Sequence, residues 1–279
     1  MNASTLLLPP AIVSVHTQGR DIDIEYQWIN AERSKAPLIV FLHEGLGSIS
    51  MWRDWPARVC AATGCRGLVY SRYGYGQSTP RPRDEARGMD YLHRQAQDDL
   101  PALLHTLGLS DERPILFGHS DGASIALIHA ALFPDAVQGI IVAAPHIFVE
   151  DVTLAGIRDA KSLYGNTDWP LRLGRHHRDA DSVFSAWVDT WLMPEFRHWN
   201  IEELLPRIRC PVLALQGEGD EYGTMEQIRG IARRLHHATL LEIPNCGHSP
   251  HRDQPDIVLR GIQDFLRGLG VSMPEGVQA

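Results

Sequence analysis

Several kinds of segment are missing from this 279-residue chain, and each absence excludes a class of protein. No apolar run approaches the roughly 20 residues that a membrane-spanning helix needs. The leucines near the amino terminus are interrupted by Pro9 and Pro10 and follow no basic region, so the pattern of a secretory leader is absent. We therefore expect no membrane as a partner.

Cysteine is also scarce, and basic residues are outnumbered by acidic ones. Four cysteines follow no disulfide spacing, so we expect reduced thiols and a cytoplasmic protein. The formal net charge of -8, without any basic cluster, argues against a nucleic-acid partner. Fourteen histidines are present, but no H-E-x-x-H or C-x-x-C spacing accompanies them, and we expect neither a metal nor a cofactor.

Apolar runs and amphipathic segments alternate along most of the chain. The apolar runs predict strands at residues 12–16, 22–28, 38–42, 67–71, 115–117, 138–144, 210–215 and 238–243. Helices are predicted at residues 51–62, 91–107, 123–131, 224–235 and 255–269, with a kink or a new segment at Pro101. This alternation predicts an α/β fold with an eight-stranded, mostly parallel sheet, helices on both faces and an antiparallel hairpin at one edge.

Residues 146–205 interrupt the alternation and predict a helical cap, inserted after the sixth strand into a core made of residues 1–145 and 206–279. Helices are expected at 152–164 and 181–191. Aromatic residues are concentrated in this segment, and we expect most of them to pack the cap onto the core. Phe148, Trp187 and Trp191 are assigned to a pocket for a small-molecule substrate.

Residues 118–122 read Gly-His-Ser-Asp-Gly and stand between a predicted strand and a predicted helix. A G-x-S-x-G turn in that context is a nucleophile elbow, in which the flanking glycines avoid collisions with neighbouring backbone. The turn lifts the hydroxyl of Ser120 above the sheet, beside the free N–H groups of a helix start. Ser120 is therefore the candidate nucleophile.

A serine nucleophile needs a base and an acid, and functional residues in such sheets follow the carboxyl ends of strands. Asp220 follows the predicted strand 210–215 and is the expected acid, with Glu221 and Glu218 as alternatives. His248 follows the last strand and is the expected base. The alternative base is His251, which we expect on the first turn of the final helix or facing solvent.

An oxyanion pocket needs two backbone N–H groups, one of them from the residue after the nucleophile. Asp121 supplies that group. Gly45, in the loop after the third strand, is the expected second donor because glycine allows close approach of the backbone, and Leu46 is the alternative.

Three motifs together resemble the α/β-hydrolase superfamily with a cap, over residues 38–266. Residues 43–47 (His-Glu-Gly-Leu-Gly) resemble its H-G-x-x-G loop, residues 72–78 (Arg-Tyr-Gly-Tyr-Gly-Gln-Ser) are similar to its R-G-x-G-x-S turn, and the elbow is the third. The order Ser120, Asp220, His248 is also the order of that superfamily's triad. The resemblance implies a cofactor-independent serine hydrolase.

Within that superfamily, the Ser-Asp-Gly elbow and residues 156–159 are similar to the valacyclovir hydrolase (biphenyl hydrolase-like) group. There the aspartate after the nucleophile binds the α-amino group of the substrate, which implies the same role for Asp121. Glu44 departs from the family glycine and adds a second carboxylate, and we assign Glu44 and Leu46 of this loop to the substrate pocket. The alternatives are an ion pair of Glu44 with Arg53 or Arg72, and a purely helix-stabilising Asp121.

The expected substrate is a small carboxylic ester, an amino-acid ester or a lactone. A C–C bond hydrolase acting on ring-fission products is an alternative, although those enzymes have a glycine-rich oxyanion loop and a tryptophan after the catalytic histidine, where this chain has Ser249. A non-catalytic ligand-binding homologue is the alternative of another class. The sequence leaves open whether the chain forms a homo-oligomer.

Overall fold

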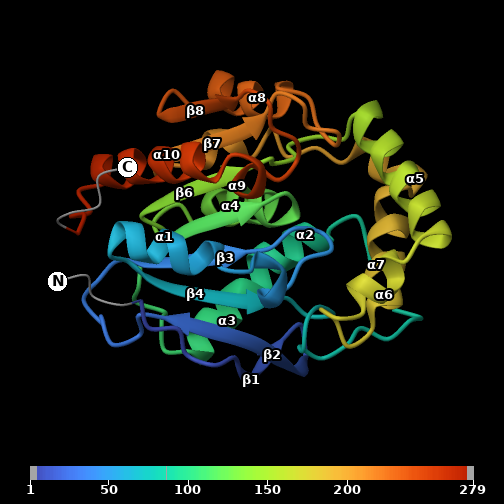
Figure 1. Ribbon diagram of the computed structural model, residues 1–279, viewed down its shortest axis with the longest axis horizontal. Helices are drawn as coiled ribbons and strands as arrows, with labels where there is room; N and C mark the ends of the chain where they lie inside the picture. The colour runs from blue at the N-terminus through green and yellow to red at the C-terminus, as the bar shows by residue number, and fades with distance from the viewer. Residues whose placement is uncertain (1–4, 86, 275–279) are drawn as a thin grey trace.

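The structure, a computed structural model, describes residues 5–85 and 87–274 and is built around one sheet (Figure 1). The sheet has eight strands in the order β1-β2-β4-β3-β5-β6-β7-β8. Strands β3 to β8 run parallel, while β2 is antiparallel to both β1 and β4. The predicted α/β fold with a mostly parallel sheet is confirmed. The strands are β1 (Ala11–Thr17), β2 (Arg20–Ile29), β3 (Leu38–Leu42), β4 (Arg66–Ser71), β5 (Ile115–His119), β6 (Gly139–Ala143), β7 (Val212–Gly217) and β8 (Ala238–Ile243).

Helices cover both faces of the sheet, which explains why the central strands read as continuous apolar runs. Successive strand residues point to opposite faces, so Ile39 and Phe41 join one core while Val40 and Leu42 join the other. The first core is completed by α1 (Trp55–Thr63) and α10 (Pro255–Gly268), which lie in front of the sheet in Figure 1. The second contains α3 (Leu100–Thr106), α4 (Asp121–Leu132) and α8 (Glu226–Arg234).

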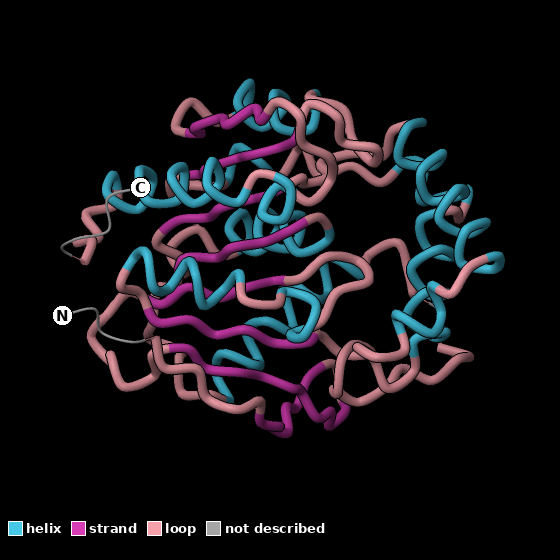
Figure 2. The backbone as a smooth tube through the Cα atoms, in the orientation of Figure 1, coloured by secondary structure: helices cyan, strands magenta, loops and turns pink. Residues whose placement is uncertain are grey.

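Between β6 and β7 the chain leaves the sheet and forms a helical segment, called the inserted segment below. The helices expected at 152–164 and 181–191 are present in it. Its elements are α5 (Asp151–Asn166), α6 (Trp169–Leu173), α7 (Ala180–Trp191) and the 3₁₀ turns η3 (Pro194–His198) and η4 (Leu205–Arg207). Helices α5, α6 and α7 stand beside the sheet rather than on either face (Figure 2).

The helix predicted at 51–62 is divided into two. A 3₁₀ turn, η1 (Ile49–Trp52), is followed by Arg53 with a φ of 54°, and α1 starts two residues later. Pro56 in the first turn favours that start, because its fixed φ suits a helix and its missing N–H would have no partner there. The apolar pattern did not reveal the interruption.

The helix predicted at 91–107 contains the irregularity expected near Pro101. It runs as α2 (Tyr91–Arg94), a π-helical turn η2 (Gln95–Asp99) and then α3. The N–H of Leu100 bonds to Gln95 and Pro101 has no N–H, so the carbonyl of Ala96 is left for another donor. His129 Nδ1 in α4 donates to it at 2.8 Å, which ties the irregular turn to the elbow helix.

The remaining helix is the short α9 (Pro250–Asp253), between β8 and α10. None of the helices in the described ranges is long and apolar enough to cross a membrane. The four cysteines are free and buried.

The elbow between β5 and α4 has no room for a side chain at residue 122. A Cβ on Gly122 would lie 2.0 Å from the carbonyl oxygen of Leu42 in β3. We expect Gly122→Ala to lower the free energy of unfolding by about 3 kcal/mol, because β3 and α4 must move apart. This free energy is measured by urea unfolding, with circular dichroism as the signal. Gly165→Ala is the matched control, since a Cβ there meets nothing within 4 Å. Equal urea midpoints for Gly122→Ala and the parent would contradict this steric account.

Candidate active site

Ser120 occupies a strained turn at the carboxyl end of β5. Its φ of 53° and ψ of -117° lie outside the regions that a serine normally adopts. A Cβ on Gly118 would lie 2.2 Å from the carbonyl oxygen of Gly122, so the turn can be this tight only with glycine there. The N–H of Ser120 donates to Ala143 in β6 at 2.9 Å, which fixes the turn to the sheet.

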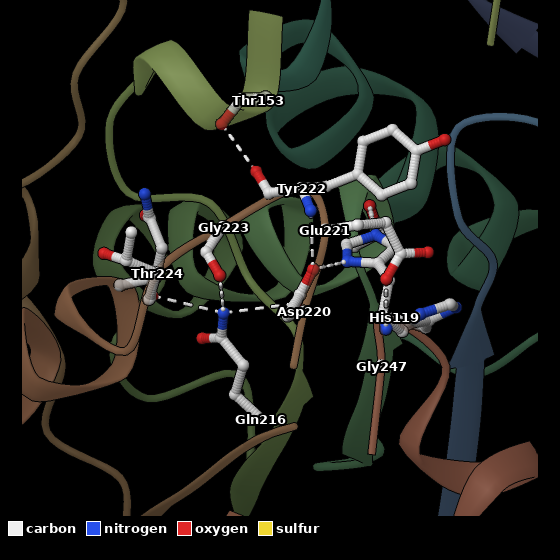
Figure 3. Close-up of polar contacts among 12 residues, drawn as sticks. His119, Thr153, Gln216, Asp220, Glu221, Tyr222, Gly223, Thr224 and Gly247 are labelled. Atoms are coloured by element: carbon white, nitrogen blue, oxygen red, sulfur yellow. Dashed lines mark hydrogen bonds and ion pairs between the residues drawn. The ribbon is translucent and has the colours of Figure 1, made fainter. Parts of the chain in front are cut away.

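A chain of hydrogen bonds runs from Ser120 to Asp220 through His248. His248 Nε2 accepts from Ser120 Oγ at 3.0 Å, and His248 Nδ1 donates to Asp220 Oδ1 at 2.8 Å. Asp220 also accepts from the N–H of Tyr222 at 2.8 Å and from Gln216 Nε2 at 3.1 Å. Figure 3 shows Asp220 between these two groups. Because Nδ1 carries the proton toward Asp220, Nε2 is free to take a proton from Ser120.

The charges around His248 favour its protonated form. Burial alone would lower the pKa of the imidazole, but Asp220, and with smaller effects Glu221 and Glu44, raise it above the ordinary value. Burial would in turn raise the pKa of Asp220, yet the contact with His248 holds it below the ordinary value. An imidazolium formed when Ser120 loses its proton is therefore stabilised in place.

None of the alternative acids and base forms a hydrogen bond with the His248 ring or with Ser120. Glu221 accepts from the backbone N–H of His248 at 3.1 Å and makes no bond to the ring, and Glu218 is exposed. His251 lies in α9, before the final helix, and does not face solvent as expected. It is buried, with its ring 5.1 Å from that of Trp52 and 5.8 Å from that of Trp55, because α9 packs on the apolar side of η1 and α1.

A cavity of about 250 Å³ opens beside Ser120 and is walled by loops at the strand ends and by the inserted segment. The predicted substrate-pocket residues Glu44, Leu46 and Asp121 line it from the loops, together with Gly45, the expected oxyanion donor. The inserted segment contributes Thr153, Ile157, Trp169, Leu173 and the predicted Trp187 and Trp191.

Phe148, which the sequence assigned to the pocket, packs outside this cavity. Its backbone forms a bridge to Asn200, where the inserted segment leaves and rejoins the sheet, and its side chain packs against the larger core. It is not among the residues that line the cavity.

Gly45 is in contact with the inserted segment. A Cβ on Gly45 would lie 2.6 Å from Cδ1 and Nε1 of Trp187, so only glycine allows this approach. His177, also in the inserted segment, donates from Nε2 to the carbonyl of Leu46 at 2.9 Å and accepts at Nδ1 from the N–H of Gly76 at 2.9 Å. The loop after β3 is thus held from two sides by the inserted segment.

Asp121 is buried, with one carboxylate oxygen bonded and the other free. Its Oδ2 accepts from the hydroxyl of Tyr91 at 2.9 Å and lies 3.6 Å from Arg72 Nη2, while its Oδ1 has no partner. As the first residue of α4, Asp121 also has an N–H without a partner inside the helix.

The alternative interpretation of Glu44, an ion pair with Arg53 or Arg72, is not found in the structure. Arg72 donates to the backbone carbonyl of Glu44 at 2.8 Å and approaches the carboxylate of Asp121 instead. The Glu44 carboxylate lies 3.7 Å from His119 Nδ1. Burial would raise the pKa of Glu44, but His119 and His43 hold it below its ordinary value.

Several residues of the site were not singled out from the sequence. His119 donates from Nε2 to the carbonyl of His248 at 2.7 Å, and its place beside Ser120 in the elbow was a usable signal. His146 lines the cavity after β6, where the strand-end rule points, and burial lowers its pKa to about 3. Tyr91 has no local signal, because it reaches Asp121 only through tertiary packing. Within residues 5–85 and 87–274, no group of three or more His, Cys, Asp or Glu side chains is arranged to hold a metal.

Comparisons with known proteins agree with this architecture. Human serine hydrolase BPHL is 29% identical over 207 residues, which cover 72% of this chain and 69% of that protein. The putative carbamate hydrolase RutD of Caulobacter sp. (strain K31) is 27% identical over 276 residues, with coverage of 90% and 98%. The solved structure of a membrane phospholipase A, a bacterial virulence factor, has the same fold, with a TM-score of 0.74 at 19% identity over 94% of this chain and 87% of that one. A family model for the α/β hydrolases matches residues 39–260. The chain belongs to the α/β-hydrolase family.

Proposed function

We propose that this α/β hydrolase is a cofactor-independent serine hydrolase that cleaves small carboxylic esters, amino-acid esters or lactones through an acyl-enzyme on Ser120. The observation that carries the proposal is the hydrogen-bonded chain from Ser120 through His248 to Asp220. A serine hydroxyl is a poor nucleophile by itself, and a base oriented by a third group is what activates it.

In the proposed reaction, Ser120 Oγ attacks the substrate carbonyl while His248 Nε2 takes its proton. The N–H groups of Gly45 and Asp121 bind the oxyanion of the tetrahedral intermediate. His248 then gives the proton to the leaving group, and water attacks the acyl-enzyme with His248 again acting as the base. Asp220 keeps the proton on Nδ1 and stabilises the imidazolium.

The charges of the cavity favour a substrate with a cationic group. Its lining includes the carboxylates of Glu44, Asp121 and Glu221 and a single guanidinium, that of Arg252. Oδ1 of Asp121 is a buried acceptor without a partner, one residue from the nucleophile, and an ammonium group of an amino-acid ester would supply the missing donor. The volume of about 250 Å³ suits a small substrate. The C–C hydrolase remains the alternative reaction.

The proposal is tested first at the nucleophile. The parent is expected to hydrolyse p-nitrophenyl acetate and to react with a fluorophosphonate probe at Ser120, because both reactions need an activated hydroxyl. Ser120→Ala should lose probe labelling and at least about 10³-fold of kcat. Absence of labelling and of turnover by the parent on esters, amino-acid esters and lactones would refute the proposal, and turnover of vinylogous diketones alone would favour the C–C hydrolase.

The raised pKa of His248 predicts the pH dependence. The base must be neutral, so kcat/KM should fall as the pH drops through the His248 pKa, with a midpoint above 6.5. Glu221 contributes to that raised pKa, and Glu221→Gln removes its charge while keeping an acceptor for the His248 N–H. The midpoint should move to lower pH by roughly 0.2–0.7 unit, since partly exposed charge pairs are worth about 0.2–1 kcal/mol.

Glu218→Gln is the control for that profile, because Glu218 lies in the same loop, is exposed and makes no contact with His248. Its midpoint should equal that of the parent. A shift of the Glu221→Gln midpoint to higher pH would show that the charge assignment is wrong.

The role of Asp121 predicts substrate selectivity. Asp121→Asn keeps the size of the side chain and removes the negative charge offered to an ammonium group. The ratio of kcat/KM for a valine p-nitrophenyl ester to that for the uncharged isovalerate ester should fall about tenfold. Because both substrates are measured on one variant, loss of folded protein cancels from the ratio. An unchanged ratio would remove Asp121 from substrate recognition.

A further inference from the structure

We propose that Arg72 is a positioning residue of the oxyanion pocket, which it orients through the carbonyl of Glu44 and the carboxylate of Asp121. The inference rests on the proposed hydrolase function. Arg72 does not line the cavity beside Ser120, so it acts on the reaction only through these two residues.

Arg72 is fixed in the interior at the end of β4. Its side chain is 1% exposed, and its guanidinium lies 4.6 Å from the centre of the Tyr75 ring. Its backbone N–H donates to His43 Nε2 at 3.0 Å. A long side chain that is buried, held at its backbone and placed over an aromatic face has little freedom left, which is what a positioning group requires.

The first contact sets the direction of the Gly45 N–H. The carbonyl of Glu44 accepts from Arg72 Nη2 at 2.8 Å and from His43 Nδ1 at 2.8 Å. Nδ1 is the protonated nitrogen of His43, because Nε2 accepts from Arg72. This carbonyl and the Gly45 N–H belong to one trans peptide group, in which they point in opposite directions. Two donors on the oxygen therefore fix the orientation of the N–H and polarise it.

The second contact concerns the other N–H donor. Asp121 supplies its backbone N–H to the pocket, but its buried carboxylate lies on the same residue. A bare negative charge at that position would oppose the negative charge that develops on the substrate oxygen. Arg72 Nη2, 3.6 Å from Asp121 Oδ2, offsets this charge, and the hydroxyl of Tyr91 holds the same oxygen at 2.9 Å. The ion pair makes an aspartate tolerable beside the nucleophile.

Both contacts come from Nη2 of one planar guanidinium, whose position is fixed by stacking on Tyr75. The ammonium of a lysine has no plane and a different reach, so Arg72→Lys keeps the charge and loses the shared geometry. The expected result is a fall of about tenfold to a hundredfold in kcat per active site on an uncharged ester, with KM changed less than about threefold. Active sites are counted by fluorophosphonate labelling to completion, so misfolded protein does not enter the rate.

Arg66→Lys is the matched control. Arg66 is also a buried arginine and is the first residue of β4, where it bonds to Glu112 and to the carbonyl of Ala36, away from the cavity. The kcat per active site of Arg66→Lys should equal that of the parent.

A second readout for Arg72→Lys is inhibition by a trifluoromethyl ketone, which forms a tetrahedral adduct on the serine. Its inhibition constant should rise with Arg72→Lys by the same factor by which kcat/KM falls.

A second comparison keeps the proposal testable if Arg72→Lys misfolds. Arg72→Met combined with Asp121→Asn removes the buried ion pair as a whole, so no unpaired charge remains. This double variant should be about tenfold slower per active site than Asp121→Asn alone, because the Glu44–Gly45 peptide has lost a donor. Equal rates for these two variants, or for Arg72→Lys and the parent, would overturn the role of Arg72. A parent without esterase activity would instead refute the proposed function.

Discussion

Backbone packing at the elbow is the constraint on which the position of Ser120 depends. The peptide groups of Gly118 and Gly122 face each other and the end of β3 at distances that exclude a Cβ at either residue. This packing forces the positive φ of Ser120 and directs its side chain away from the sheet. The strain is held by the hydrogen bond to Ala143 and by helix α4 behind it, which is buried from Asp121 to Ala131. A hydroxyl fixed in this way can meet a base that arrives from a distant part of the chain.

Each of three carboxylates of the site faces a basic side chain near that fixed point. Asp220 faces His248, Asp121 faces Arg72, and Glu44 faces His119. Each carboxylate is at least partly withdrawn from water, where an unpaired charge would be costly. The Asp121 carboxylate is not fully paired, because its Oδ1 has no hydrogen-bond partner.

The sequence predicted those parts of the site that depend on short-range pattern. Ser120 follows from its glycines, and Asp220 and His248 follow from the ends of apolar runs, because parallel strands bring their carboxyl ends to one edge. The fold class follows from the same alternation. Arg53 interrupts a helix through a backbone conformation that no apolar pattern encodes. The positions of Phe148 and Tyr91 depend on contacts across the fold. Arg72 approaches the carboxylate of Asp121 and not that of Glu44, and this choice depends on side-chain directions that spacing alone does not give.

The contact between Gly45 and Trp187 has a consequence for rebuilding this enzyme. The loop after β3 can approach Trp187 of helix α7 because Gly45 has no side chain. His177 donates a further hydrogen bond to the same loop. The inserted segment is therefore not an exchangeable module. A foreign segment grafted between β6 and β7 would leave the loop without its wall unless it also brought an indole to the same place. The two parts of the chain have to be redesigned together.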